Sequence, residues 1–319
     1  MRPEKRKDFA LTFLIMTELL NPEIFRTVLE RMQTGVYLVD TERRILFWND
    51  GAERITGYLR HQVLGRLCRE NILMDCDGNS CGLCGSACPI SETMHEGHSK
   101  EARVYFRHQQ GHQVPVHLRV VPIRDEHGSV VGAAESFEEL TDDSHDADLA
   151  AYGCLDTSTG VPNHAFTHSH LRESLATFDE YHVPVSVLGI HVDRLEQTQA
   201  THGHKAVEYI LRAAAGTIKN VLGPGGFVGR WSEHEFLAIM MACDEAQVER
   251  TVDSIQKIVS CSTVRWWDDR IQVHASVAHT TVRPGDTLES LIERLEVLQR
   301  QNPAQGTSLS APGVDRARD

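Results

Sequence analysis

The first half of the chain mostly alternates apolar and polar residues, a pattern typical of β-strands. Two short runs are followed, after a polar segment, by three longer ones: 35–40, 44–49, 101–108, 112–123 and 129–140. Gln110-Gly111 and His127-Gly128 mark turns between the longer runs. The pattern predicts an antiparallel sheet with one buried face.

An amphipathic helix is predicted ahead of these strands, over residues 22–33. Its apolar positions fall on one helical face: Ile24, Phe25, Val28, Leu29 and Met32. Asn21 before Pro22 is a suitable N-cap. A helix with an antiparallel sheet predicts an α+β domain over 21–140, preceded by an N-terminal arm at 1–20.

The second half alternates helical and strand-like periods. We expect helices at about 163–180, 205–222, 245–260 and 287–300, and strands at 185–192, 235–241, 263–267 and 271–281. This alternation predicts an α/β domain over 155–302 whose helices pack on a sheet. Trp266-Trp267 is expected to pack within its strand. An acidic linker is predicted at 141–154 and a disordered tail at 303–319.

Composition and charge exclude several classes of protein. The 319 residues contain 32 Lys and Arg and 45 Asp and Glu, a net charge of −13, which argues against binding to nucleic acid or an anionic membrane. No apolar run approaches the roughly 20 residues of a membrane span. The first residues lack a signal-peptide cleavage site, so a cytoplasmic location is expected.

Five cysteines are clustered between the short and the long strands. They are Cys68, Cys76, Cys81, Cys84 and Cys88. Four of them could form a tetrahedral zinc site or hold an iron–sulfur cluster. The same thiols could instead form a reversible disulfide, or be reduced and bind nothing. The spacing leaves these alternatives open, and the cofactor is otherwise unknown.

Residues 35–66 and 111–140 resemble a PAS sensor domain. The resemblance rests on a hairpin, an Asn before a short helix, the Thr56-Gly57-Tyr58 turn and the closing strands, which occur in the family's order. It implies a five-stranded antiparallel sheet with short helices over a pocket. PAS domains hold haem, flavin, metabolites or nothing, so the resemblance leaves the ligand open. The cysteine cluster, at 68–88, is an insertion in this domain.

The second domain resembles a GGDEF domain, the module that joins two GTP molecules into cyclic di-GMP. Five landmarks occur in the family's order: 156–164, 188–196, Gly203-His204, 230–236 and 274–278. The resemblance implies a cyclase-like sheet covered by helices.

Several residues depart from the family's chemistry. The family holds magnesium with carboxylates at two positions, which are His191 and His234 here. Asp193 and Glu235 are retained nearby, but imidazole is a poor ligand for magnesium. Ser232-Glu233 replaces two signature glycines, and side chains there obstruct a phosphate.

Other family positions have changed as well. The guanine contacts fall at Gln199 and Glu208, the phosphate-binding lysine falls near Pro303, and the inhibitory product site falls at Gly223 and Gly226. Each change is expected to cost a few kcal/mol of transition-state stabilisation. Because such costs add, the reductions in rate multiply, and we expect no cyclase catalysis. A new transition-metal site at His191, His234 and Asp193 is left as an alternative.

The sequence therefore predicts a signalling protein. A PAS domain senses a redox, metal or small-molecule cue, and a catalytically inactive GGDEF domain relays it as a homodimer or by docking a signalling partner. The alternatives are an active diguanylate cyclase and a receptor that binds GTP or cyclic di-GMP.

Overall fold

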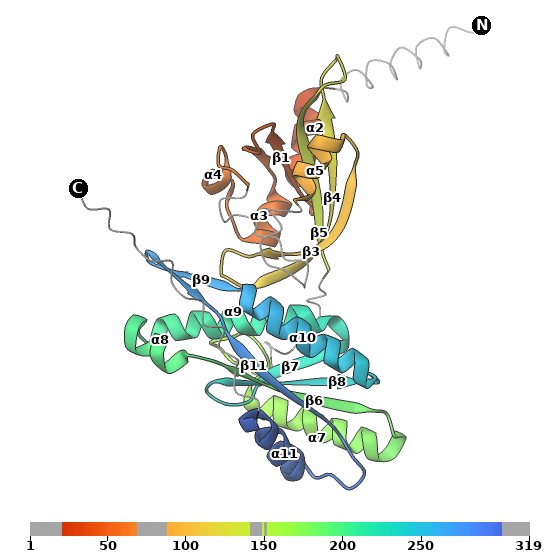
Figure 1. Ribbon diagram of the computed structural model, residues 1–319, viewed down its shortest axis with the longest axis vertical. Coiled ribbons are helices and arrows are strands. Elements are labelled where there is room, and N and C mark those ends of the chain that lie inside the picture. The colour runs from red at the N-terminus through yellow and green to blue at the C-terminus, as the bar shows by residue number, and fades with distance from the viewer. Residues whose placement is uncertain (1–20, 69–87, 141–148, 150–151, 302–319) are drawn as a thin grey trace, which may run out of the picture.

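The computed structural model describes residues 21–68, 88–140, 149 and 152–301. The predicted N-terminal arm, most of the acidic linker and the tail lie outside these ranges. Two domains are stacked along the long axis of the molecule (Figure 1). Helices α9 and α10 of the second domain face the first domain.

The first domain contains the predicted five-stranded antiparallel sheet. Its elements are α2 (Pro22–Arg31), β1 (Gly35–Asp40), β2 (Ile45–Trp48), α3 (Asp50–Thr56), α4 (Arg60–Val63), α5 (Pro89–Glu96), β3 (Lys100–Arg107), β4 (Gln113–Arg124) and β5 (Val130–Glu139). The strand order is β2-β1-β5-β4-β3. The predicted helix and strands are confirmed within a few residues.

A buried asparagine explains how the start of this domain folds. Asn49 is fully buried and caps α3, because its side-chain oxygen accepts hydrogen bonds from the backbone N–H groups of Ala52 and Val36, both at 2.8 Å. Its amide donates to the carbonyls of Leu29 and Thr34, both at 2.9 Å. One side chain thus connects α2, β1 and α3.

The second domain is a four-stranded antiparallel sheet between two pairs of helices. Its elements are α7 (His164–Tyr181), β6 (Val185–Val192), α8 (Leu195–His202), α9 (His204–Leu222), a 3₁₀ turn at Gly223–Gly225, β7 (Gly226–Arg230), β8 (Glu235–Met241), α10 (Glu245–Cys261), β9 (Thr263–Trp266), β10 (Asp269–Gln272), β11 (Ala275–Thr281) and α11 (Leu288–Gln301). The strand order is β11-β6-β8-β7. Helices α9 and α10 cover one face of the sheet, and α7 and α11 cover the other (Figure 1).

Two expectations for this domain are wrong. Residues 271–281 do not form one strand, because residues up to Gln272 pair with β9 as a separate hairpin and those from Ala275 pair with β6. Trp267 does not pack, since it lies in the hairpin turn with a positive φ of 53° and is 84% exposed. Trp266 does contact a neighbour, the ring of Tyr209.

The turn between β3 and β4 brings the first domain onto the second. At its tip, Gly111 has a φ of 98°, and an added Cβ would lie 2.9 Å from the carbonyl oxygen of Thr263. An added Cβ on Gly216 of α9 would lie 3.2 Å from the ring of His112. The two backbones approach closely because both positions are glycine.

Buried hydrogen bonds accompany this contact. The backbone N–H of Gln113 donates to Oγ1 of Thr217 at 3.0 Å, and its side-chain amide donates to the carbonyl of Cys261 at 3.0 Å. Arg107 donates to the same carbonyl at 3.2 Å, and Asn220 donates to the carbonyl of Gln113 at 2.7 Å. Gln113 and Thr217 are fully buried. Such buried polar groups are costly when unpaired, so the bonds select one docked arrangement of the domains.

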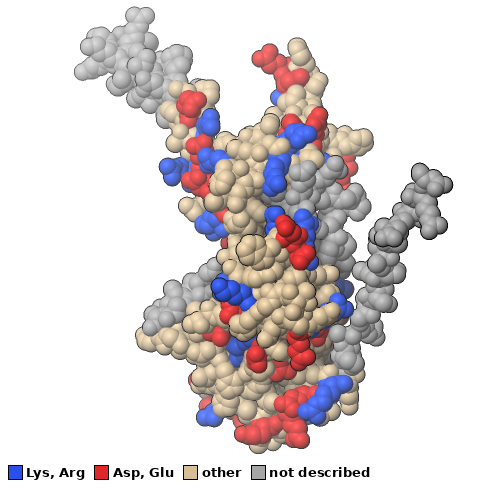
Figure 2. Space-filling model, turned by 90° about the vertical axis from the view of Figure 1, so that its left-hand side faces the viewer, with Lys and Arg blue, Asp and Glu red and all other residues tan. Residues whose placement is uncertain are grey.

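The surface carries both signs of charge. On the face shown in Figure 2, Lys and Arg side chains are interspersed with Asp and Glu and do not form one continuous basic surface. Among the described residues, no helix combines the length and apolar character needed to cross a membrane.

Candidate functional site

The candidate site lies where the end of β6 meets the turn between β7 and β8. The register of the sheet places His191 directly opposite Glu235 on β8 and Ser276 on β11. The turn residues 231–234 put His234 close by, with ring centroids of the two histidines 6.3 Å apart. The structure therefore brings together the two imidazoles that the sequence analysis singled out.

His191 and Glu235 form the charged pair of this site. Nδ1 of His191 lies 3.8 Å from Oε1 of Glu235, and both side chains are partly exposed. The Glu235 carboxylate raises the pKa of His191 above its ordinary value, although burial opposes this; the carboxylate of Asp193 adds to the rise. His191 in turn lowers the pKa of Glu235, against the effect of burial. The site thus favours an imidazolium beside a carboxylate.

The residues that replace the signature glycines make their own contacts. Oγ of Ser232 donates to Oε2 of Glu235 at 2.9 Å, so the retained carboxylate is engaged by two neighbours. Glu233 is exposed, with its carboxylate 3.9 Å from Nε2 of His234 and its carbonyl accepting a hydrogen bond from Arg230. Side chains therefore occupy the turn over which a phosphate would need bare backbone.

Asp193 follows β6 and lies beside β11. Its Oδ1 accepts a hydrogen bond from Ser276 at 3.1 Å, and its backbone N–H donates to the carbonyl of His274 at 2.8 Å. Its Oδ2 is buried without a hydrogen-bond partner. Burial lowers the pKa of His274, and Arg194 lowers it further, against the opposing effect of Asp193.

This donor set does not fit a magnesium–triphosphate site. Magnesium requires oxygen ligands in octahedral geometry, whereas the site offers two imidazoles, the Asp193 carboxylate and the Glu235 carboxylate, which is already engaged by His191 and Ser232. Within the described ranges, no group of three or more His, Cys, Asp or Glu side chains is arranged to hold a metal ion. The transition-metal alternative at His191, His234 and Asp193 stays a prediction.

The remaining family positions are spread around the domain. Gln199 is exposed on α8, and Glu208 on α9 lies 3.5 Å from His204 one turn earlier. Gly223, with a φ of 64°, begins the 3₁₀ turn that leads to Gly226 and β7. Pro303 lies outside the described residues. None of the described positions offers a cation for a phosphate.

An aromatic group beside the site was not anticipated from the sequence. Trp231 lies between His164 and His168 of α7, with ring centroids 5.1 and 6.4 Å away. The two histidines are four residues apart and therefore fall on one face of a helix. This spacing is the only feature of the sequence that could have indicated the aromatic group.

The cysteine cluster is only partly described. Cys68 and Cys88 are buried in the core of the first domain. Cys76, Cys81 and Cys84 lie outside the described residues, so the proposed zinc, iron–sulfur or thiol-switch roles stay predictions. In the second domain Cys243 is a free thiol, whereas Cys261 is disulfide-bonded.

Comparison with known families agrees with this arrangement. Residues 33–142 match the family described as PAS domain, and residues 154–308 match the family described as Diguanylate cyclase, GGDEF domain. The chain is therefore a PAS domain followed by a GGDEF domain.

Individual relatives are distant. The chain is 22% identical over 242 residues to the probable diguanylate cyclase DgcE of Escherichia coli K12, covering 72% of this chain and 21% of that protein. It is 20% identical over 190 residues to the diguanylate cyclase DgcP of Pseudomonas aeruginosa PAO1, covering 60% and 28%. It thus spans less than a third of these relatives' length. The crystal structure of the diguanylate cyclase SiaD from Pseudomonas aeruginosa, in complex with its activator SiaC, is 24% identical with a TM-score of 0.46, over 49% of this chain and 61% of that one.

Proposed function

We propose that this protein acts in cyclic di-GMP signalling as a sensor whose GGDEF domain does not make the nucleotide. The single observation that carries this proposal is the contact between His191 and Glu235. An imidazole whose pKa is raised by Glu235 stands at a position where the family places a metal-binding carboxylate, and it pairs with the acidic residue retained at the second signature. A positive charge there disfavours a divalent cation.

The turn between β7 and β8 supports the same proposal. Glu233 places a carboxylate where a triphosphate would approach, and like charges repel. Ser232 uses its hydroxyl on Glu235. Each loss of transition-state binding costs about tenfold in rate per 1.4 kcal/mol, so several together abolish useful turnover.

The test is incubation of the purified full chain with GTP and either Mg²⁺ or Mn²⁺, followed by chromatographic analysis of the nucleotides. We expect no cyclic di-GMP and no linear dinucleotide. Because a copurified cyclase could give traces of product, the Glu235→Gln variant is assayed in parallel. Product that disappears with Glu235→Gln belongs to this chain and would refute the proposal, leaving the active cyclase as the function.

Calorimetry with GTP and with cyclic di-GMP distinguishes a GGDEF domain that acts as a nucleotide receptor from one that only relays the signal. A receptor requires saturable binding of one of them. The described structure offers little for guanine, since Gln199 is exposed and the carboxylate of Glu208 lies 3.5 Å from His204. We therefore expect neither ligand to bind.

We further propose that the two domains communicate through the turn between β3 and β4. The buried bonds of Gln113 to Thr217 and Cys261 offer a direct route between them. Helix α10 also packs on the sheet through its other residues, so a shift at its C-terminal end reaches the whole domain.

A homodimer is supported by the exposed face of α2. Ile24, Phe25, Val28 and Met32 are 36–56% exposed, although they form one apolar stripe. Val28→Glu is expected to shift the protein from dimer to monomer in size-exclusion chromatography with light scattering. Thr27→Glu adds the same charge outside the apolar stripe and serves as the control. Identical masses for the parent and both variants would argue against this interface.

The cue sensed by the PAS domain is proposed to be redox state or a metal. The support is the five-cysteine cluster and the disulfide at Cys261, whose carbonyl receives two hydrogen bonds from the first domain. Metal analysis of protein purified without oxygen, and differential alkylation of its thiols with and without oxidant, test this input. Protein with neither bound metal nor oxidisable thiols would leave a small molecule as the cue.

A further inference from the structure

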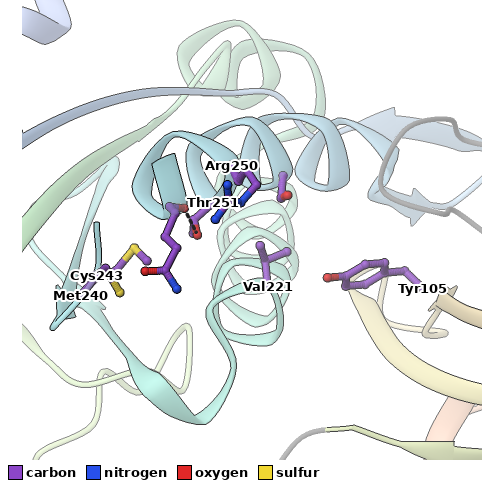
Figure 3. Close-up of a pocket in the computed structure, with 8 residues that line it drawn as sticks. Tyr105, Val221, Met240, Cys243, Arg250 and Thr251 are labelled. Carbon is purple, nitrogen blue, oxygen red and sulfur yellow. Dashed lines mark hydrogen bonds between the residues drawn. The ribbon is translucent and has the colours of Figure 1, made fainter. Parts of the chain in front are cut away.

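A cavity of about 290 Å³ lies at the junction of the two domains, away from the turn between β7 and β8. Tyr105 of β3 contributes from the first domain, and α9, α10 and the end of β8 contribute from the second (Figure 3). Figure 3 shows the hydroxyl of Tyr105 pointing toward Val221, with Arg250 and Thr251 beyond it on α10. A ligand held here would touch both domains.

Three polar side chains of this cavity have no partner among the described residues. Within the part of the chain that the structure describes, Arg250 has no ion pair, and the hydroxyls of Tyr105 and Ser254 have no hydrogen bond. The hydroxyl of Thr251, by contrast, already donates to the carbonyl of Gln247 at 2.9 Å. Burial alone raises the pKa of the Tyr105 hydroxyl, which is therefore a neutral donor at physiological pH.

Apolar side chains form another part of the wall, beside Gln247 and Thr251. Met240 is almost fully buried, and Val221 packs with Tyr105 against Ile258 and Cys261. One guanidinium and two hydroxyls above an apolar floor suit a ligand with one anionic head and a short apolar body. The volume limits this ligand to a small molecule.

We propose that this interdomain cavity binds a small organic anion, a carboxylate or phosphate monoester with a short apolar group. Binding would stabilise the docked arrangement of the domains, because the ligand gains its full set of contacts only when Tyr105 faces α10. The proposal goes beyond the relay function and does not depend on whether GTP is turned over.

The experiment uses the full chain and phenyl phosphate as the probe, with benzyl alcohol as its uncharged counterpart. Calorimetry is expected to show saturable binding of phenyl phosphate and at least tenfold weaker binding of benzyl alcohol. Arg250→Gln is expected to weaken phenyl phosphate binding by about tenfold or more, as for loss of a charge-assisted hydrogen bond. Lys257→Gln removes the same charge from a residue of the same helix that does not line the cavity, and it is expected to leave affinity unchanged.

Tyr105→Phe tests the role of the first domain. Removal of this one hydroxyl is expected to weaken binding by a few-fold while the unfolding temperature without ligand stays that of the parent. The proposal is overturned if the parent does not bind phenyl phosphate saturably, if Arg250→Gln and Lys257→Gln behave alike, or if Tyr105→Phe binds as the parent does. None of these results bears on the cyclase assay, so the two proposals fail separately.

Discussion

The side-chain amide of Gln113, in the first domain, donates a hydrogen bond of 3.0 Å to the carbonyl of Cys261, in the second. Gln113 is fully buried, and Cys261 ends α10. The last carbonyls of a helix have no partner within the helix. The first domain therefore completes the C-terminal end of α10, which makes the docked arrangement part of the folded state of the second domain.

Gln113→Ala is expected to lower the free energy of unfolding by about 1–3 kcal/mol, because it removes a buried hydrogen bond and leaves space at the contact. Denaturant unfolding measures this loss, and small-angle scattering of the native protein is expected to show a larger radius of gyration. Gln110→Ala, at the exposed tip of the same turn, is the control and is expected to change the unfolding free energy by less than about 0.5 kcal/mol. Equal stability and equal scattering of the two variants would contradict the role of this contact.

The domain contact could not be predicted from the sequence. Arg107 and Gln113 lie 154 and 148 positions before Cys261, and no periodicity relates residues so far apart. Most strands other than β7 were predictable because each buries one face, so that apolar residues alternate within a few positions. The separation of β10 from β11 was not, since it depends on which neighbour each half pairs with.

The candidate site was more accessible to prediction. The resemblance to the GGDEF family placed His191 and His234 at two signature positions, and the register of β6 and β8 brings them together. The contact of His191 with Glu235 could not be predicted from the sequence, because it depends on the side-chain conformations at the end of the sheet. That contact changes the charge of the site and supports the argument against magnesium.

His108, in the turn between β3 and β4, is expected to make stability depend on pH. Burial lowers its pKa from 6.5 to about 4. The unfolded chain takes up a proton as pH falls below about 6.5, but the folded protein does so only near pH 4. The stabilising contribution of neutral His108 is therefore complete above pH 6.5 and is lost as pH falls toward 4.

The measurement compares the parent with His108→Asn, whose side-chain oxygen can replace Nδ1 as acceptor for the backbone N–H of Gln110. The difference between their unfolding free energies is expected to change by up to about 1.4 kcal/mol per pH unit between pH 6.5 and 4. His127→Asn, at an exposed position in the next turn, is the control. If the difference between the parent and His108→Asn stays constant across this range, His108 is not a buried neutral imidazole.

The contribution of His191 to stability depends on pH in the opposite sense to that of His108. Because the folded protein raises the pKa of His191, the contribution of its charge is present below about pH 6.5 and is lost as pH rises through the folded value. Because the pKa of Glu235 is lowered, its contribution is present above about pH 4.5 and is lost as pH falls through its folded value.

A double-mutant cycle of His191→Gln and Glu235→Gln measures this interaction. Both side chains are partly exposed, so a coupling of only about 0.5–1 kcal/mol is expected at pH 5.5, with a smaller value at pH 8.5. A coupling that is equal at the two pH values would mean that the contact does not depend on an imidazolium.

His191→Asp tests whether one residue keeps magnesium out of the site. The new carboxylate would face Glu235 and lie near Asp193, so we expect a lower unfolding temperature without divalent cations and its recovery in millimolar Mg²⁺. The parent is expected to show no such recovery, since an imidazole is a poor ligand for magnesium and its protonated form repels the cation. His61→Asp, at an exposed position on α4, controls for general effects of charge and salt. Stabilisation of the parent by Mg²⁺ to the same extent as His191→Asp would show that the imidazole does not exclude the metal.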